Sequence, residues 1–189
     1  MTVKPDPTEL PLALPINLVL IGFMGSGKSS IGRILATKLG FHLVDTDALI
    51  VQEAGMPITE IFAWQGEEGF RDFEAKALAG LVDRSTHGLV IATGGGIVTR
   101  EENLPLLHRL GFVVELTASE EVIFERVSRN KARPLLHTPN PRETVSKLLA
   151  HRAPMYAAAA DFSIDSTVKT HTQVADELIE EARRRYPCG

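Results

Sequence analysis

The sequence has few of the features that mark secreted, membrane-spanning or nucleic-acid-binding proteins. Its 189 residues include a single cysteine, Cys188, so no disulfide can form within the chain, which fits a reducing compartment. No apolar run approaches the ~20 residues that a membrane-spanning helix needs. The net charge of −4 provides no broad basic surface. We therefore expect a cytoplasmic protein that binds neither nucleic acid nor membranes.

Proline is concentrated near the N-terminus, where positions 5, 7, 11 and 15 are all proline. These prolines exclude a continuous helix, and the segment lacks the basic start and unbroken apolar stretch of a signal peptide. We expect residues 1–15 to form a flexible proline-rich tail. Residues 16–186 are expected to form a single domain, because this length suits one compact unit with its own core.

Short apolar segments alternate with helical patterns along this domain. The apolar segments, which indicate buried strands, cover residues 16–21, 41–44, 89–93, 112–116 and 162–164. Helices are expected after the first, second, fourth and fifth strands, the longest over about 57–84 and 142–158, with Gly40 placed to end the first and Thr117 or Ser119 to cap another. The alternation predicts an α/β fold, in which a parallel sheet carries helices on both faces and ligands bind at the carboxyl ends of the strands.

The segment Gly22–Ser29 reads GFMGSGKS and matches the phosphate-binding pattern G-x-x-x-x-G-K-[ST]. Glycines let successive backbone N–H groups point at phosphate oxygens, and the N-terminus of the following helix attracts anions. Lys28 would reach the β- and γ-phosphates, and Ser29 would ligate Mg²⁺. A turn that merely happens to carry Lys-Ser is the alternative, but a strand before it and a helix after it favour a nucleotide site. The residues predicted to cradle the phosphates are Gly25, Ser26, Gly27, Lys28, Ser29 and Ser30.

Two carboxylates, Asp45 and Asp47, follow the second expected strand. Being two residues apart in extended chain, they are expected to point the same way. Beside a phosphate-binding loop, one could hold Mg²⁺ through its water shell and the other could accept a proton from an attacking hydroxyl. The competing interpretation is that Asp47 only caps the next helix; the position at a strand end favours function.

Two arginines outside this loop suggest an anionic substrate. Arg152 shares one helical face with apolar residues such as Val145 and Tyr156, where a lone cation is too costly to bury unless it is paired or faces a ligand. Arg71 lies on the flank of its own helical stripe and could instead form a surface ion pair with Glu67 or Glu74. Guanidinium groups bind carboxylates through two hydrogen bonds, so a carboxylate-bearing substrate is plausible.

A glycine run and a basic loop complete the candidate site. Gly94-Gly95-Gly96 follows the third strand and would let backbone approach a ligand closely, although a tight turn that needs positive φ would also use glycine. Arg126, Arg129 and Arg133 lie around a proline-bearing loop at about 130–141. They form either a solvated helix face or a lid that brings an arginine to the transferring phosphoryl group.

Taken in order, these segments resemble the shikimate kinase family over residues 16 to about 179. The matching segments are GSGKSS, Asp45-Thr-Asp47, ITEIFAWQGEEGFR, ATGGG, RPLL from Arg133, and Arg152-Ala-Pro-Met-Tyr156. The resemblance implies a P-loop NTPase fold of the nucleoside-monophosphate kinase type, three-layer α/β/α with a five-stranded parallel sheet. It also implies phosphorylation of the 3-hydroxyl of shikimate by ATP in aromatic amino-acid biosynthesis, with residues about 130–141 as a lid.

The resemblance further implies roles for single residues. Asp47 would hold the reacting hydroxyl, and the residues that would hold the shikimate are Arg71, Gly95 and Arg152. On the nucleotide side, Asp45 would support Mg²⁺ through water. The other nucleotide contacts implied are Arg133 at the phosphates, Arg126 against the adenine and Lys169 nearby, where the sequence departs from the family pattern.

Three other functions remain possible from sequence alone. A P-loop kinase for another hydroxy acid, such as gluconate, would also need a carboxylate clamp. A regulatory module that binds nucleotide without catalysis should have lost Lys28, Asp47 or the arginines, yet all are present. A GTPase would need an N-K-x-D element, which Asn130-Lys131-Ala132-Arg133 lacks. A small kinase of this kind can act as a monomer.

Overall fold

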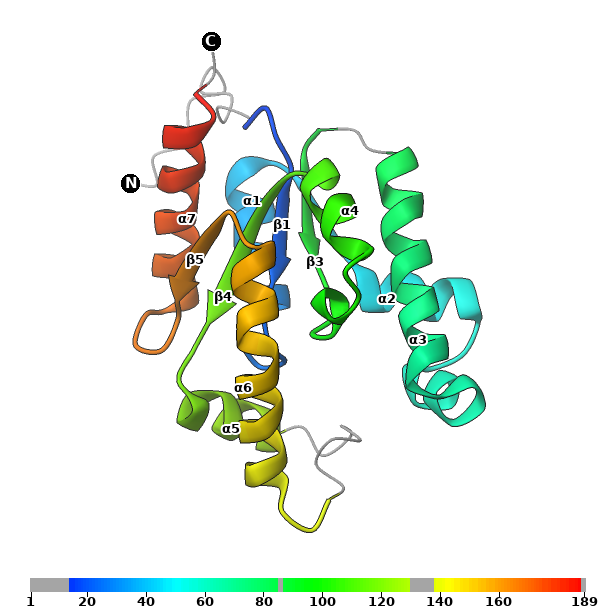
Figure 1. The fold of residues 1–189 in the computed structure, drawn as a ribbon. Coiled ribbons are helices and arrows are strands. Elements are labelled where there is room, and N and C mark those ends of the chain that lie inside the picture. Colours follow the sequence, from blue (N-terminus) through cyan, green and yellow to red (C-terminus); the bar gives the residue numbers. More distant parts are fainter. Residues whose placement is uncertain (1–13, 85–86, 130–137, 188–189) are drawn as a thin grey trace, which may run out of the picture.

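Five parallel strands form the middle layer of the structure (Figure 1), a computed structural model that describes residues 14–84, 87–129 and 138–187. The strands are β1 (Leu18–Ile21), β2 (His42–Asp45), β3 (Leu89–Ala92), β4 (Phe112–Thr117) and β5 (Phe162–Asp165). They pair in the order β2-β3-β1-β4-β5, and every pairing is parallel. The expected five-stranded parallel sheet is confirmed.

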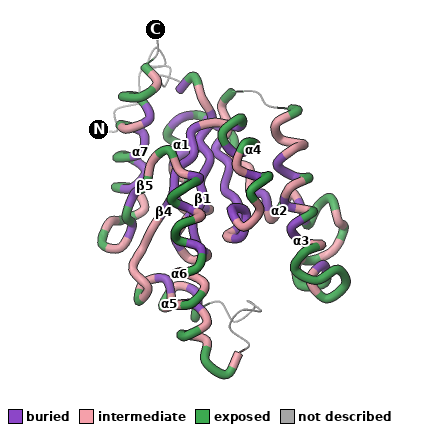
Figure 2. Tube along the Cα trace, in the orientation of Figure 1, coloured by how far each residue is buried: buried purple, intermediate pink, exposed green. Residues whose placement is uncertain are grey.

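Alternate side chains of the strands enter two separate cores, one on each face of the sheet. Leu18 and Leu20 of β1 pack with helices α1 (Lys28–Leu39) and α7 (His171–Arg185). Val19 and Ile21 enter the opposite core, which includes residues of α3 (Ile58–Asp83), α4 (Asn103–Leu110), α5 (Glu120–Ser128) and α6 (Pro141–Ala159). Figure 2 shows the buried residues along the strands, with exposed residues on the outer helix faces. The three-layer α/β/α prediction is therefore correct.

Two helix ends show the capping chemistry expected from sequence. Gly40 ends α1 in the left-handed conformation at φ 68°, as predicted. Ser119 rather than Thr117 caps α5, because its hydroxyl accepts a hydrogen bond from the N–H of Val122.

Leu14, assigned to the tail from sequence, is buried in the first core, so the folded domain includes at least this residue. No helix in the described ranges is long and apolar enough to cross a membrane.

Two features of the helices were not expected. The chain between β3 and β4 forms a short 3-10 turn, η1 (Ile97–Thr99), and α4, which is only eight residues long and carries a proline in its first turn. The long helix expected over 57–84 is interrupted at Gly66, whose φ of 70° and ψ of −169° are accessible essentially to glycine alone. The interruption redirects the chain between α2 (Thr46–Ala54) and the second half of α3.

Candidate active site

The loop between β1 and α1 has the geometry of a phosphate cradle. Gly25 and Gly27 have φ values of 81° and 102°, which residues with side chains rarely adopt, and Lys28 begins α1 directly afterwards. The ammonium group of Lys28 donates to the carbonyls of Gly22 and Phe23 at 2.8 and 2.9 Å. Backbone N–H groups, a helix N-terminus and a lysine therefore converge on one point, an arrangement suited to nucleotide phosphates.

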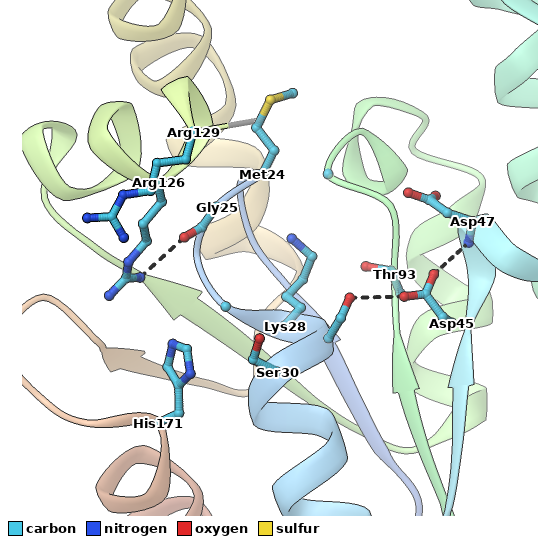
Figure 3. Close-up of a pocket in the computed structure, with 13 residues that line it drawn as sticks. Met24, Gly25, Lys28, Ser30, Asp45, Asp47, Thr93, Arg126, Arg129 and His171 are labelled. Carbon is cyan, nitrogen blue, oxygen red and sulfur yellow. Dashed lines mark hydrogen bonds between the residues drawn. The ribbon is translucent and has the colours of Figure 1, made fainter. Parts of the chain in front are cut away.

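A cleft of about 450 Å³ opens at this point, at the carboxyl ends of β1, β2 and β3. Asp45 and Asp47 lie on one side of the loop, and Arg126, Arg129 and His171 lie on the other (Figure 3). The remaining lining residues are Met24, Gly25, Gly27, Lys28, Ser29, Ser30, Thr93 and Gly95. Ser26 is the one predicted cradle residue outside this lining; its side chain is buried beneath the loop.

Asp45 connects the loop to the start of α2. Its carboxylate accepts the hydroxyl hydrogen of Ser29 at 2.9 Å and the N–H groups of Asp47 and Ala48 at 3.1 and 3.4 Å. Asp45 is therefore the N-cap of α2, and the competing interpretation, that Asp47 caps this helix, is wrong. The pairing of a serine hydroxyl with a carboxylate beside a phosphate cradle is suited to Mg²⁺, which prefers oxygen ligands.

Asp47 lies in the first turn of α2, half-buried in the wall of the cleft. The chain turns helical at Thr46, so strand alternation does not align Asp45 and Asp47; they share the cleft because the helix begins at the end of β2. The Thr46 hydroxyl accepts the N–H of Gly94 at 3.0 Å, which fixes α2 against the segment after β3. Asp47 thus lies over the glycine run.

The run Gly94-Gly95-Gly96 permits close contacts and has no positive φ, so a tight turn does not explain it. A Cβ on Gly94 would lie 2.5 Å from an oxygen of Glu74 and 2.7 Å from one of Asp47, and a Cβ on Gly96 would overlap the guanidinium of Arg71. Gly94 and Gly96 therefore leave room for functional side chains, whereas a Cβ on Gly95 would approach the P-loop backbone, 3.1 Å from the N atom of Met24. This agrees with the interpretation that backbone here is approached closely.

Arg71 is buried, so the alternative of a surface ion pair is wrong in its location, although both candidate partners are present. Its guanidinium donates to Glu74 at 2.6 Å and to Glu67 at 2.7 Å. Burial acts to lower the pKa of Arg71, but Glu74 and Glu67 outweigh it and raise the pKa. Burial also raises the pKa of Glu74. The positive charge of Arg71 acts to lower this pKa, whereas repulsion from Asp47 raises it further.

Arg152 approaches the same place from α6. It is buried, donates to the carbonyl of Gly95 at 3.0 Å, and lies over the ring of Phe23 with its guanidinium carbon 6.0 Å from the centroid. The hydroxyl of Tyr156 donates to the same Gly95 carbonyl at 2.5 Å, and burial raises the pKa of Tyr156 to about 12. The prediction that Arg152 is a buried cation on an apolar helix face is confirmed. Gly95, which accepts its hydrogen bond, also lines the phosphate cleft.

The nucleotide side of the cleft differs in part from expectation. Arg126 donates to the carbonyls of Gly25 and Ser166, so it lies against the P-loop. Lys169 does not line the cleft and forms an ion pair with Glu177, whereas His171, at the start of α7, does line it. Arg133 and most of the expected lid lie outside the described residues.

Glu74, Tyr156 and His171 belong to the site but were assigned no role in it from sequence. Glu74 follows Arg71 by three positions and Tyr156 follows Arg152 by four, so each shares a helical face with a predicted arginine. That spacing was the available signal. His171 had none, because only the packing of α7 beside α1 brings it to the cleft.

Comparisons with known proteins agree with this geometry. The shikimate kinase family model matches residues 24–183. Shikimate kinase from Thermodesulfovibrio yellowstonii is 46% identical over 89% of this chain and 95% of its own length. The counterpart from Symbiobacterium thermophilum is 43% identical over 92% of this chain and 100% of its own length.

Solved structures extend the comparison to three dimensions. Shikimate kinase from Acinetobacter baumannii in complex with shikimate superposes with a TM-score of 0.86 at 34% identity, covering 95% of this chain and 98% of that one. A gluconokinase from Sinorhizobium meliloti, at 19% identity and a TM-score of 0.56 over 92% and 95% of the two chains, shares the fold alone. The chain therefore belongs to the shikimate kinase family, whose members are kinases that use ATP as the phosphate donor.

Proposed function

We propose that this protein transfers the γ-phosphoryl group of MgATP to the 3-hydroxyl of shikimate. The observation that carries the proposal is the placement of two buried arginines, Arg71 beside Gly96 and Arg152 beside Gly95, next to the phosphate cleft that Gly95 lines. A carboxylate held by the arginines places the rest of a small ring acid toward Asp47 and the P-loop. The A. baumannii enzyme, whose structure contains shikimate, supports this choice of acid.

ATP would bind with its phosphates in the P-loop and its base on the side of Arg126 and His171. Lys28 and the loop N–H groups would bind the β- and γ-phosphates, and because the transition state of phosphoryl transfer is loose, holding its charge in place is most of the catalysis. The Ser29 hydroxyl and Asp45, 2.9 Å apart, would hold Mg²⁺, Asp45 through water. When bound, Mg²⁺ neutralises charge on the phosphates.

Asp47 would orient the acceptor hydroxyl and take its proton late in the transfer. It lies beside the glycine run and lines the same cleft as the P-loop, so a hydroxyl bonded to it would face the γ-phosphate position. The proposal includes a lid at about 130–141 that carries Arg133 toward the phosphates and excludes water, which would otherwise hydrolyse ATP. This part rests on the family resemblance, since Arg133 lies outside the described residues.

The first experiment is a coupled assay of ADP release with MgATP and shikimate, gluconate, quinate or no acceptor. Turnover that depends on shikimate supports the proposal, and turnover with another acid alone would keep the mechanism and change the substrate. ATP binding without acceptor-dependent turnover would favour a regulatory module.

The same assay tests Asp47. Asp47→Asn should lower kcat by ~10²–10⁴, the usual range for losing a positioned acid–base group, because the amide cannot take the proton. The Kd for ATP should stay within a few-fold of wild type, since the P-loop is unchanged. A variant with near-normal turnover would remove Asp47 from this role.

A further inference from the structure

The space between Arg71 and Arg152 already holds a carboxylate of the chain itself. Oε1 of Glu67 lies 2.7 Å from Nη2 of Arg71 and 4.0 Å from Nη2 of Arg152. The two arginines come from different helices, α3 and α6, and the Glu67 carboxylate is the group that bridges them. Its position is therefore equivalent to that of a ligand carboxylate held by both guanidinium groups.

The two arginines depend on Glu67 to different degrees. Arg71 also pairs with Glu74, whose side chain is fully buried at 0% exposure, so Arg71 keeps a carboxylate partner if Glu67 leaves. For Arg152, Glu67 at 4.0 Å is the one ion-pair partner among the described residues. The Nε atom of Arg152 is buried and has no hydrogen-bond partner among those residues. Arg152 is thus a buried cation with donor capacity left over.

Glu67 itself is placed so that it can leave at low cost. Its side chain is 61% exposed, while those of Arg71 and Arg152 are 7% and 8% exposed. It follows Gly66, where α3 is interrupted, and a Cβ on Gly66 would meet nothing within 4 Å. An exposed carboxylate that turns outward regains water, whereas buried Arg152 would be left without a carboxylate partner among the described residues unless a ligand supplied one.

We propose that Glu67 is a specificity-determining residue. Its carboxylate occupies the position between Arg71 and Arg152 that the substrate carboxylate takes, and only a ligand bearing a carboxylate displaces it. This inference rests on the proposed function of the site. Exchange of one carboxylate for another keeps both arginines paired. An uncharged ligand of the same shape would have to bind with Glu67 still in place, or leave Arg152 unpaired, so the site selects against it.

The test measures binding by calorimetry, without ATP, for shikimate and for its uncharged methyl ester. The variant is Glu67→Gln, which keeps the shape of the side chain and removes its charge. The matched control is Glu68→Gln, the neighbouring carboxylate, which is 87% exposed and pairs with Arg100 at 3.1 Å. Glu67→Gln should bind shikimate roughly three- to tenfold more tightly, the scale of one exposed ion pair removed from competition, and the ester within twofold of wild type.

Kinetics give the second readout. In Glu67→Gln the KM for shikimate should fall while kcat and the KM for ATP stay within twofold, and Glu68→Gln should resemble wild type. Weaker or unchanged shikimate binding in Glu67→Gln overturns the inference and makes Glu67 a support for Arg71. An equal gain in Glu68→Gln also overturns it, because bulk charge then explains the effect. Shikimate binding without turnover in wild type would reject the proposed function alone; no binding would reject both.

Discussion

Arg152 shows how one side chain in this site serves several contacts at once. It donates to the Gly95 carbonyl, lies over Phe23 and approaches Glu67, so it connects the acceptor end to Gly95, which lines the phosphate cleft. Removing a charge from water costs free energy, and a bound ligand of opposite charge offsets that cost. The position therefore links recognition of an acid to the place where phosphate is transferred.

Arg152→Ala should raise the KM for shikimate by about ten- to a hundredfold, because hydrogen bonds to charged groups contribute ~1.5–3 kcal/mol. The KM for ATP should change little, since Arg152 does not line the nucleotide side of the cleft. Steady-state kinetics with each substrate varied in turn measures both. Arg184→Ala, on the exposed surface of α7, is the control. An equal rise in both KM values would indicate that Arg152 is structural.

Residues inside a local motif could be predicted from sequence, whereas residues recruited by packing could not. Lys28 and Ser29 lie in the cleft because they begin the helix after the glycine loop, and Asp47 lies there because it follows the end of β2 by two residues. His171 reaches it only because α7 packs beside α1, a contact that no spacing along the chain encodes. His171, which lines the cleft where Lys169 was expected, could therefore not be identified before the fold was known.

Among the elements, the segment after β3 has the most constrained role. It connects the sheet to η1 and receives Asp47 and Glu74 at Gly94, Arg152 and Tyr156 at Gly95, and the Arg71 guanidinium at Gly96. Three side-chain-free positions in sequence therefore allow helices α2, α3 and α6 to place groups around one short stretch of backbone.

Gly96→Ala should impair acid binding without requiring a strained backbone. Gly96 has φ −109° and ψ 1°, which alanine can adopt, but the added Cβ would displace the guanidinium of Arg71. We expect the KM for shikimate to rise about tenfold or more, the loss of one charge-assisted hydrogen bond, with the KM for ATP nearly unchanged. Gly80→Ala, in α3 with open space around it, is the control and should keep wild-type kinetics. Normal shikimate KM in Gly96→Ala would contradict this.

Element order could be predicted well because apolar runs and helical stripes persist over many residues. All five strands were expected within a few residues of their observed bounds. Helix α4 was missed because eight residues with an early proline give too little periodicity to separate from a loop. The interruption at Gly66 was missed because a single glycine is tolerated in a helix, and only tertiary packing decides that the chain turns there.

For the molecule as a whole, one buried carboxyl group makes stability depend on pH. Glu115 lies in the middle of β4, hydrogen-bonded to Ser163 of β5 at 2.8 Å. Burial raises its pKa, although the Ser163 hydrogen bond opposes this. The native state then holds a proton that the unfolded state has lost, so this group's contribution to stability falls as pH rises above about 4.5, through the raised pKa.

Glu115→Gln should therefore gain stability relative to wild type as pH increases from 4.5 to 8. Thermal unfolding of both proteins at several pH values measures the difference in Tm. Glu121→Gln should show the opposite sign: hydrogen bonds from its own backbone and from Ser119 lower the pKa of Glu121, so wild type has a contribution above pH ~4.5 that the variant lacks. A Tm difference for Glu115→Gln that does not vary with pH would contradict the prediction.

The two arginines of the proposed carboxylate clamp, Arg71 and Arg152, lie far apart in the sequence, which has a consequence for biosynthesis. The P-loop and Asp47 are complete by residue 47, but the clamp needs Arg71 from α3 and Arg152 from α6. Because translation proceeds from the N-terminus, a nascent chain carries its whole phosphate-binding motif long before the second arginine has left the ribosome. Recognition of the acceptor is thus acquired later in synthesis than binding of phosphate.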